Sequence, residues 1–174
     1  MWPAKVGLFL LRVFTGALFI DAIYYKLWVT RIQGLDLSLL EAFDHFVETD
    51  YKPLIRHAVQ NPPEVFGHPV TGYAVFLENV MLPGAVPDVV GPAILVFELL
   101  LGISLVLGLG VRLMAFLGAL LMVAFGLAKN MYLLSVTGTN WLLFFVLLFF
   151  ALAGAGRVWG LDTKPRHRWP GWIS

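Results

Sequence analysis

Four ionisable side chains fall within apolar stretches of the sequence, where a charge is costly. They are Asp21, Lys26, Glu98 and Lys129. A charged side chain near the centre of a membrane helix costs at least about 2.5 kcal/mol, so each needs a partner, a route to water or a function. All four lie near one end of their helices, at a depth of about 10 Å or slightly less at 1.5 Å per residue. They form either an interhelical charge cluster that fixes packing or a site for a polar headgroup or a proton path.

Arg12 is a further charge in the first apolar stretch, and it lies toward the opposite end. At 100° per residue it shares a helix face with Gly16, Phe19, Ile23 and Lys26, which we expect to look into a helix bundle. The planar guanidinium could bind a lipid phosphate or a partner's carboxylate, or the side chain could snorkel to the interface. Arg12 is therefore a candidate anion contact on the inner side.

Several kinds of redox site are excluded or disfavoured by the residues that the sequence lacks. Without cysteine, the chain has no thiolate chemistry, no iron–sulfur ligation and no covalently attached haem. The histidines all lie outside the apolar stretches and their spacing matches no metal signature; they are His45, His57, His68 and His167. The sequence has no cluster of basic residues that would favour nucleic-acid binding. We expect no metal and no covalently bound cofactor.

The elements that position these residues must be membrane helices. Of 174 residues, 59% are hydrophobic and 13% are charged, against roughly 25% charged residues in soluble domains. Four apolar stretches are long enough to span the bilayer: residues 6–29, 89–109, 113–136 and 141–158. We predict an all-α integral membrane protein, with residues 1–174 forming a single membrane domain built on a four-helix bundle.

The distribution of basic residues predicts the orientation of the bundle. In a four-span arrangement one side collects six basic residues: Lys5, Arg112, Arg157, Lys164, Arg166 and Arg168. The loop at about 30–88, between the first and second spans, has three basic residues against eight acidic ones. Because basic residues stay on the cytoplasmic side, we expect both termini, including the tail at 159–174, to be cytoplasmic and the loop to be extracytoplasmic.

The long outer loop contains two helical patterns. Ser38 and Glu41 form a capping box before an apolar stripe. A second stripe runs from Tyr73 to Met81, and the prolines after Asn61 separate the two. These helices either cap the outer mouth of the bundle or dock a partner.

Several stretches resemble the DoxX and DoxD family of small four-helix membrane proteins. The first span follows the family's RxxxGxxFxxAGxxK pattern, apart from Ile23, through Arg12, Gly16, Phe19, Ala22 and Lys26. The segments FELLLGISLVLGLGVRL at 97–113 and NWLLFFVLLFFALAGAGRVWGLD at 140–162 are similar to its second span and its closing segment. The segment GYAVFLENVMLP at 72–83 resembles the DoxD branch.

The resemblance implies a subunit like the small subunit of thiosulfate:quinone oxidoreductase, in a prokaryotic plasma membrane. Our leading hypothesis is a membrane subunit of an electron-transfer complex that contacts quinone near Asp21, Lys26, Glu98 and Lys129. Such a chain is at most an oxidoreductase subunit that needs a partner. The alternative is a non-catalytic accessory subunit that stabilises or assembles a larger membrane complex. A small transporter ranks third, because four short helices offer little for alternating access.

Overall fold

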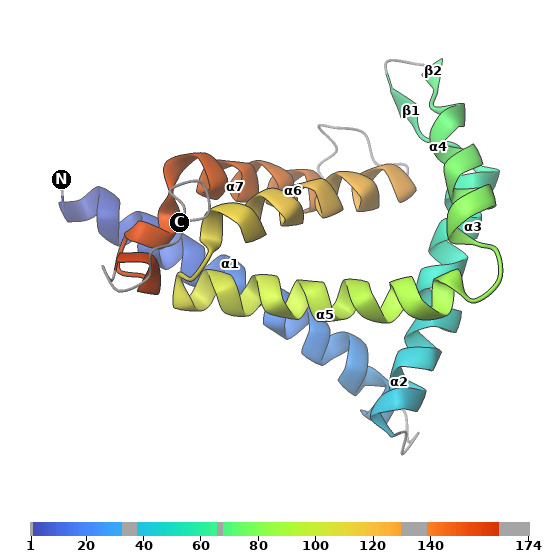
Figure 1. Ribbon diagram of the computed structural model, residues 1–174, viewed down its shortest axis with the longest axis horizontal. Coiled ribbons are helices and arrows are strands. Elements are labelled where there is room, and N and C mark those ends of the chain that lie inside the picture. Colours follow the sequence, from blue (N-terminus) through green and yellow to red (C-terminus); the bar gives the residue numbers. More distant parts are fainter. Residues whose placement is uncertain (1, 33–37, 66–67, 130–138, 164–174) are drawn as a thin grey trace. The chain divides into compact units, whose positions relative to one another are not determined.

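A computed structural model describes residues 2–32, 38–65, 68–129 and 139–163 (Figure 1). The chain divides into two compact units, which share its long helices. Unit 1 comprises Met1–Ile23, Phe97–Met122 and Leu142–Ser174, and unit 2 comprises Tyr24–Val96 and Val123–Trp141. The prediction of a single membrane domain stays a prediction.

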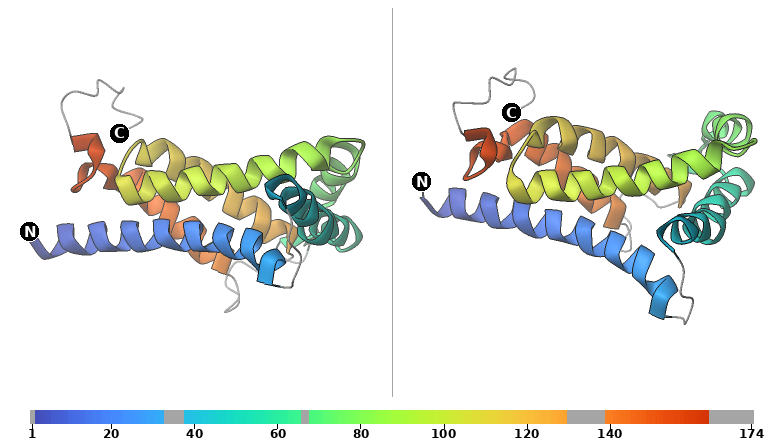
Figure 2. Two further views of the ribbon diagram at one scale, coloured as in Figure 1. Left: turned by 90° about the horizontal axis from the view of Figure 1, so that it is seen from below. Right: turned by 60° about the horizontal axis from the view of Figure 1, so that its bottom comes forward.

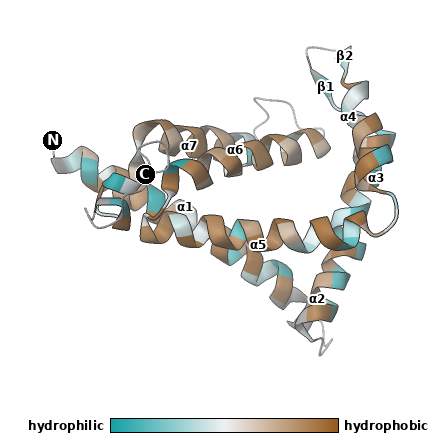
Figure 3. Ribbon diagram, viewed as in Figure 1, coloured by the Kyte–Doolittle hydropathy of each residue, from teal (hydrophilic) through white to brown (hydrophobic). Residues whose placement is uncertain are grey.

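Three of the described helices are long and apolar enough to cross a membrane. They are α1 (Trp2–Ile32), α5 (Val86–Leu107) and α6 (Val111–Ala128). Figure 3 shows the predominance of hydrophobic residues along α5 and α6. These helices confirm the first two predicted spans and most of the third, whose predicted end lies outside the described residues. Such helices require lipid around them, so the chain is an integral membrane protein.

The fourth predicted span corresponds to a shorter helix, α7 (Thr139–Ala153), of 15 residues. At 1.5 Å per residue it covers about 22 Å, less than the roughly 30 Å of a hydrocarbon core. The helix stops because Gly154 adopts a left-handed conformation with φ of 60°. Two short 3₁₀ turns follow, η3 (Ala155–Arg157) and η4 (Leu161–Thr163). A fourth crossing stays a prediction.

The outer segment is helical, as its patterns predict. Helix α2 (Leu39–Phe46) begins at the predicted capping box, in which Ser38 and Glu41 bond to each other's backbone N–H. It continues through a π-helical turn, η1 (Val47–Tyr51), into α3 (Lys52–Gln60). The second stripe forms α4 (Thr71–Phe76) and another π-helical turn, η2 (Leu77–Met81). A short antiparallel hairpin, β1 (Glu64–Val65) and β2 (His68–Pro69), joins the two runs and was not predicted.

The core of unit 2 combines the outer helices with the spans. In Figure 1 α3 lies beside α4. The buried residues of this core, which we call the outer core, come from the outer helices and from α5 and α6: Phe46, Val47, Tyr51, Ile55, Ala58, Leu77, Leu95 and Ala128. Within unit 2, therefore, the outer helices and the ends of two spans bury a common set of apolar side chains.

In unit 1 the first and second spans approach closely at two glycines. A Cβ atom at Gly16 would lie 2.7 Å from the backbone oxygen of Gly102, and one at Gly102 would lie 2.9 Å from that of Gly16. Any side chain at either position would collide with the facing backbone, so both must be glycine for this contact. On the same face of α1, Arg12, Phe19 and Ile23 are buried, which confirms that this face looks inward.

Helices α5 and α6 are antiparallel neighbours joined by a tight turn (Figure 2). Gly108 and Gly110 have φ values of 69° and 61°, in the left-handed region that glycine tolerates best. The N–H groups of Gly108 and Leu109 both donate to the carbonyl oxygen of Ser104. This pair of bonds terminates α5. These bonds and the two left-handed glycines reverse the chain within three residues, between Leu107 and Val111.

Candidate functional site

Arg12 connects the first span to the turns that follow α7. Its side chain is fully buried in unit 1, so it does not snorkel to the surface. The Nη1 group donates hydrogen bonds to the carbonyl oxygens of Ala155, at 2.7 Å, and Val158, at 3.1 Å. The guanidinium carbon lies 5.5 Å from the ring centroid of Phe9. These contacts fix the chain after α7 against α1.

Asp162 completes this arrangement, which we call the inner lock. Its Oδ1 accepts a hydrogen bond from the N–H of Gly110 at 2.9 Å, and its Oδ2 accepts one from Val111 at 3.4 Å. The carboxylate therefore accepts hydrogen bonds from backbone N–H groups at the start of α6, where the helix dipole also favours a negative charge. It also interacts electrostatically with Arg12. A Cβ at Gly160 would lie 2.9 Å from Nη1 of Arg12, so the backbone must come close here.

Two donor groups of Arg12 have no acceptor within the described segments, namely Nε and Nη2. Charged donors are rarely buried without acceptors, because desolvation is costly. An oxyanion could accept from both groups at once. The predicted anion contact at Arg12 therefore stays a prediction.

The four predicted intramembrane charges occupy different surroundings. Glu98 is buried in α5, with 4% of its surface exposed, whereas Asp21 is exposed on α1. Lys26 is half-buried, and Lys129 is exposed just after α6. The two acids belong to unit 1 and the two lysines to unit 2, so their convergence stays a prediction. Burial distinguishes Glu98 from the other three.

The buried hydroxyls of unit 1 have structural explanations. Thr15 donates to the carbonyl oxygen of Leu11 at 2.8 Å, and Ser104 donates to that of Leu109 at 2.6 Å. Both bonds stay within a helix or its terminating turn, as is usual for such residues in apolar helices. Glu98 is the buried acid among the described residues of unit 1.

The sequence patterns did not identify two tyrosines of unit 2 as candidate site residues. Tyr73 donates a hydrogen bond to the carbonyl oxygen of Ala124 at 2.9 Å. Tyr51 is 4% exposed, and burial together with the nearby Tyr73 raises the pKa of Tyr51 to about 12. The signal was present: Val47, Tyr51 and Ile55 recur every four residues, which places a phenol on the buried face of an amphipathic run.

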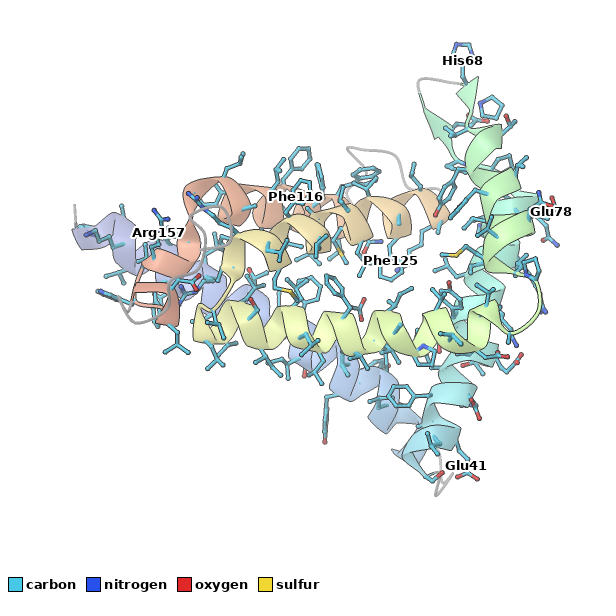
Figure 4. All side chains as sticks on the ribbon, in the orientation of Figure 1. Glu41, His68, Glu78, Phe116, Phe125 and Arg157 are labelled. Atoms are coloured by element: carbon cyan, nitrogen blue, oxygen red, sulfur yellow. The ribbon has the colours of Figure 1, made fainter. Side chains whose placement is uncertain are left out.

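The remaining charges described in the outer segment are exposed, apart from Lys52, which is half-buried. Lys52 bonds to Glu48, one turn earlier, and to Asp88 of α5 at 3.1 Å. These carboxylates raise the pKa of Lys52. Glu78 and Arg157 point outward from their respective units (Figure 4). No three histidine, aspartate or glutamate side chains in the described ranges are placed to hold a metal ion, and His167 lies outside those ranges.

Comparison with known proteins finds one family model that matches part of the chain. No curated protein and no solved structure matches the chain. The family model of DoxX matches residues 54–131, which include most of α3, all of α4 and the spans α5 and α6. The matched region therefore contains Glu98 and the tight turn between antiparallel spans, both of which the sequence resemblance included. This match covers less than half of the chain, and over these residues it confirms the resemblance to the DoxX family.

Proposed function

We propose that this chain is the membrane-embedded subunit of an electron-transfer complex and that it contacts quinone, as in a thiosulfate:quinone oxidoreductase. The observation that carries the proposal is the burial of Glu98 in a spanning helix. A carboxylate in such a place is costly and most often marks a path for protons or a polar ligand.

The chemistry assigned to Glu98 is proton transfer. Reduction of a quinone to a quinol requires two electrons and two protons, and the protons must reach a ring held in an apolar environment. A carboxylic acid within hydrogen-bond reach of a quinone oxygen can deliver one of them. Because the chain has no cysteine, the electrons would come from a partner subunit.

A second candidate function is supported by the apolar surface of α7. Leu142 and Leu152 are 65% and 75% exposed on this helix, which is short for a span. A larger membrane assembly could cover such a surface, in which case the chain would be an accessory subunit with no ligand of its own. The orientation proposed with either function has both termini in the cytoplasm of a prokaryotic cell and the loop outside.

Gentle detergent extraction followed by lipid and protein analysis separates the two functions. If the chain contacts quinone, the purified chain should retain quinone at a level approaching one molecule per site and should also retain an electron-donating partner. Stoichiometric partners without retained quinone would favour the accessory function. An isolated chain that neither retains nor binds added quinone would contradict the proposed function.

A further inference from the structure

The hydroxyl of Tyr51 is buried in the outer core without a hydrogen-bond acceptor. Its Oη atom lacks an acceptor anywhere in the described part of the chain. The surrounding core side chains are apolar and include Phe46, Val47 and Leu77. Buried polar groups without partners are rare in native proteins, because losing the hydrogen bond to water is costly. The hydroxyl therefore points to an acceptor that lies beyond the described residues, such as a bound ligand.

The hydroxyl is a neutral donor, which limits the acceptor. With a pKa of about 12, the Tyr51 phenol stays protonated at physiological pH. The neighbouring Tyr73 already donates its own proton to Ala124. An anion would have to lose its hydration in an apolar core, so a neutral oxygen suits the site better. The carbonyl oxygen of an otherwise apolar ring has this character.

Two residues of the predicted quinone site border the same core. The Nζ atom of Lys26 lies 5.7 Å from the ring centroid of Phe46, a member of the outer core. Lys129 directly follows Ala128, another member. Met81 packs at the edge of the core, and its flexible side chain can make room for a flat ring.

We propose that Tyr51 donates a hydrogen bond to a carbonyl oxygen of the quinone, whose ring enters the outer core. This inference rests on the proposed function and adds to it a residue that binds the ligand. Tyr51 is thus a binding residue that recognises the oxidised ring through its carbonyl.

The test compares decylubiquinone binding by the full chain in lipid nanodiscs, unaltered or carrying Tyr51→Phe. Tyr25→Phe is the matched control, because the Tyr25 side chain is 67% exposed. Loss of one neutral hydrogen bond should weaken binding by about threefold to tenfold for Tyr51→Phe and leave it unchanged for Tyr25→Phe. The thermal midpoint of ligand-free Tyr51→Phe should equal or exceed that of the unaltered chain, because the variant loses a hydroxyl that had no acceptor.

Three results would overturn the inference. Equal affinity of Tyr51→Phe and the unaltered chain would overturn it alone and leave the proposed function standing. A lower ligand-free thermal midpoint for Tyr51→Phe would show that the hydroxyl already bonds to water or to the protein. Failure of the unaltered chain to bind decylubiquinone would overturn both the inference and the proposed function.

Discussion

Replacing Gly16 with alanine tests the contact between the first and second spans. The new methyl group would lie 2.7 Å from the backbone oxygen of Gly102 and 2.9 Å from Cγ2 of Val106. The Val106 side chain can rotate away, but the backbone oxygen belongs to a helix and cannot. The two spans must therefore separate locally to admit the methyl group.

The magnitude follows from two opposing effects. Overpacking of this kind costs about 1 to 3 kcal/mol. Alanine also favours the helix over glycine by roughly 0.5 to 1 kcal/mol. Gly7→Ala in the same helix supplies this second effect alone, because a Cβ at Gly7 would meet no atom within 4 Å. The difference between the two variants should therefore equal the cost of the contact, with Gly16→Ala less stable by about 1 to 3 kcal/mol.

Unfolding of both variants in the same mixed micelles provides the measurement. Gly16→Ala should unfold at a lower denaturant concentration than the unaltered chain, and Gly7→Ala at an equal or higher one. Equal stability of the two variants would refute the close approach of α1 and α5 at this position.

Further predictions concern the inner lock, the outer helix and the topology. Arg12→Met leaves the carbonyl oxygens of Ala155 and Val158 without their donor, so it should destabilise the chain by about 2 to 4 kcal/mol in thermal unfolding. Arg56→Met, at an exposed position of α3, should change the stability by less than about 0.5 kcal/mol. Equal effects would contradict the inner lock. Hydrogen bonds from Ser38 lower the pKa of Glu41, so the capping box contributes stability above the unfolded pKa, near 4.5, and loses it as pH falls through the lower folded pKa. An NMR titration should find that Ser38→Ala raises this pKa, and an unchanged value would contradict the capping geometry. Finally, Glu64→Cys and Arg157→Cys, in a chain without native cysteine, should react with an impermeant reagent from opposite sides of the membrane; labelling from one side would contradict the four-span topology.

The local elements could be predicted because neighbouring residues determine them. The spans follow from apolar length, and the capping box requires only Ser38 and Glu41, three positions apart. The end of α7 was harder to predict, because apolar residues continue past Gly154 and the left-handed glycine ends the helix within an apolar run. The strands of the hairpin near Glu64 are too short to show a recognisable alternation of apolar and polar residues.

The site depends on contacts that no local pattern encodes. Arg12 and its acceptor Ala155 are 143 residues apart in sequence. Spans that are apolar on most sides give no pattern from which the exposure of a single acid can be predicted, so the sequence could assign Asp21 and Glu98 to similar depths but not to different surroundings. The structure leaves Asp21 exposed and buries Glu98. The Tyr51 hydroxyl could not be predicted as a site group because the aromatic ring of Tyr51 fits the apolar pattern of the buried helix face.

The most direct test of the proposed function is the quinone-reduction rate of the complex purified through a tag on this chain, with and without Glu98→Gln. Glutamine preserves the size of the side chain but cannot carry a proton. If Glu98 delivers protons to the ring, turnover should fall by at least about tenfold while the complex stays assembled and its thermal midpoint changes much less. Unchanged turnover in an assembled complex would contradict the role of Glu98 and, with it, the proposed quinone site.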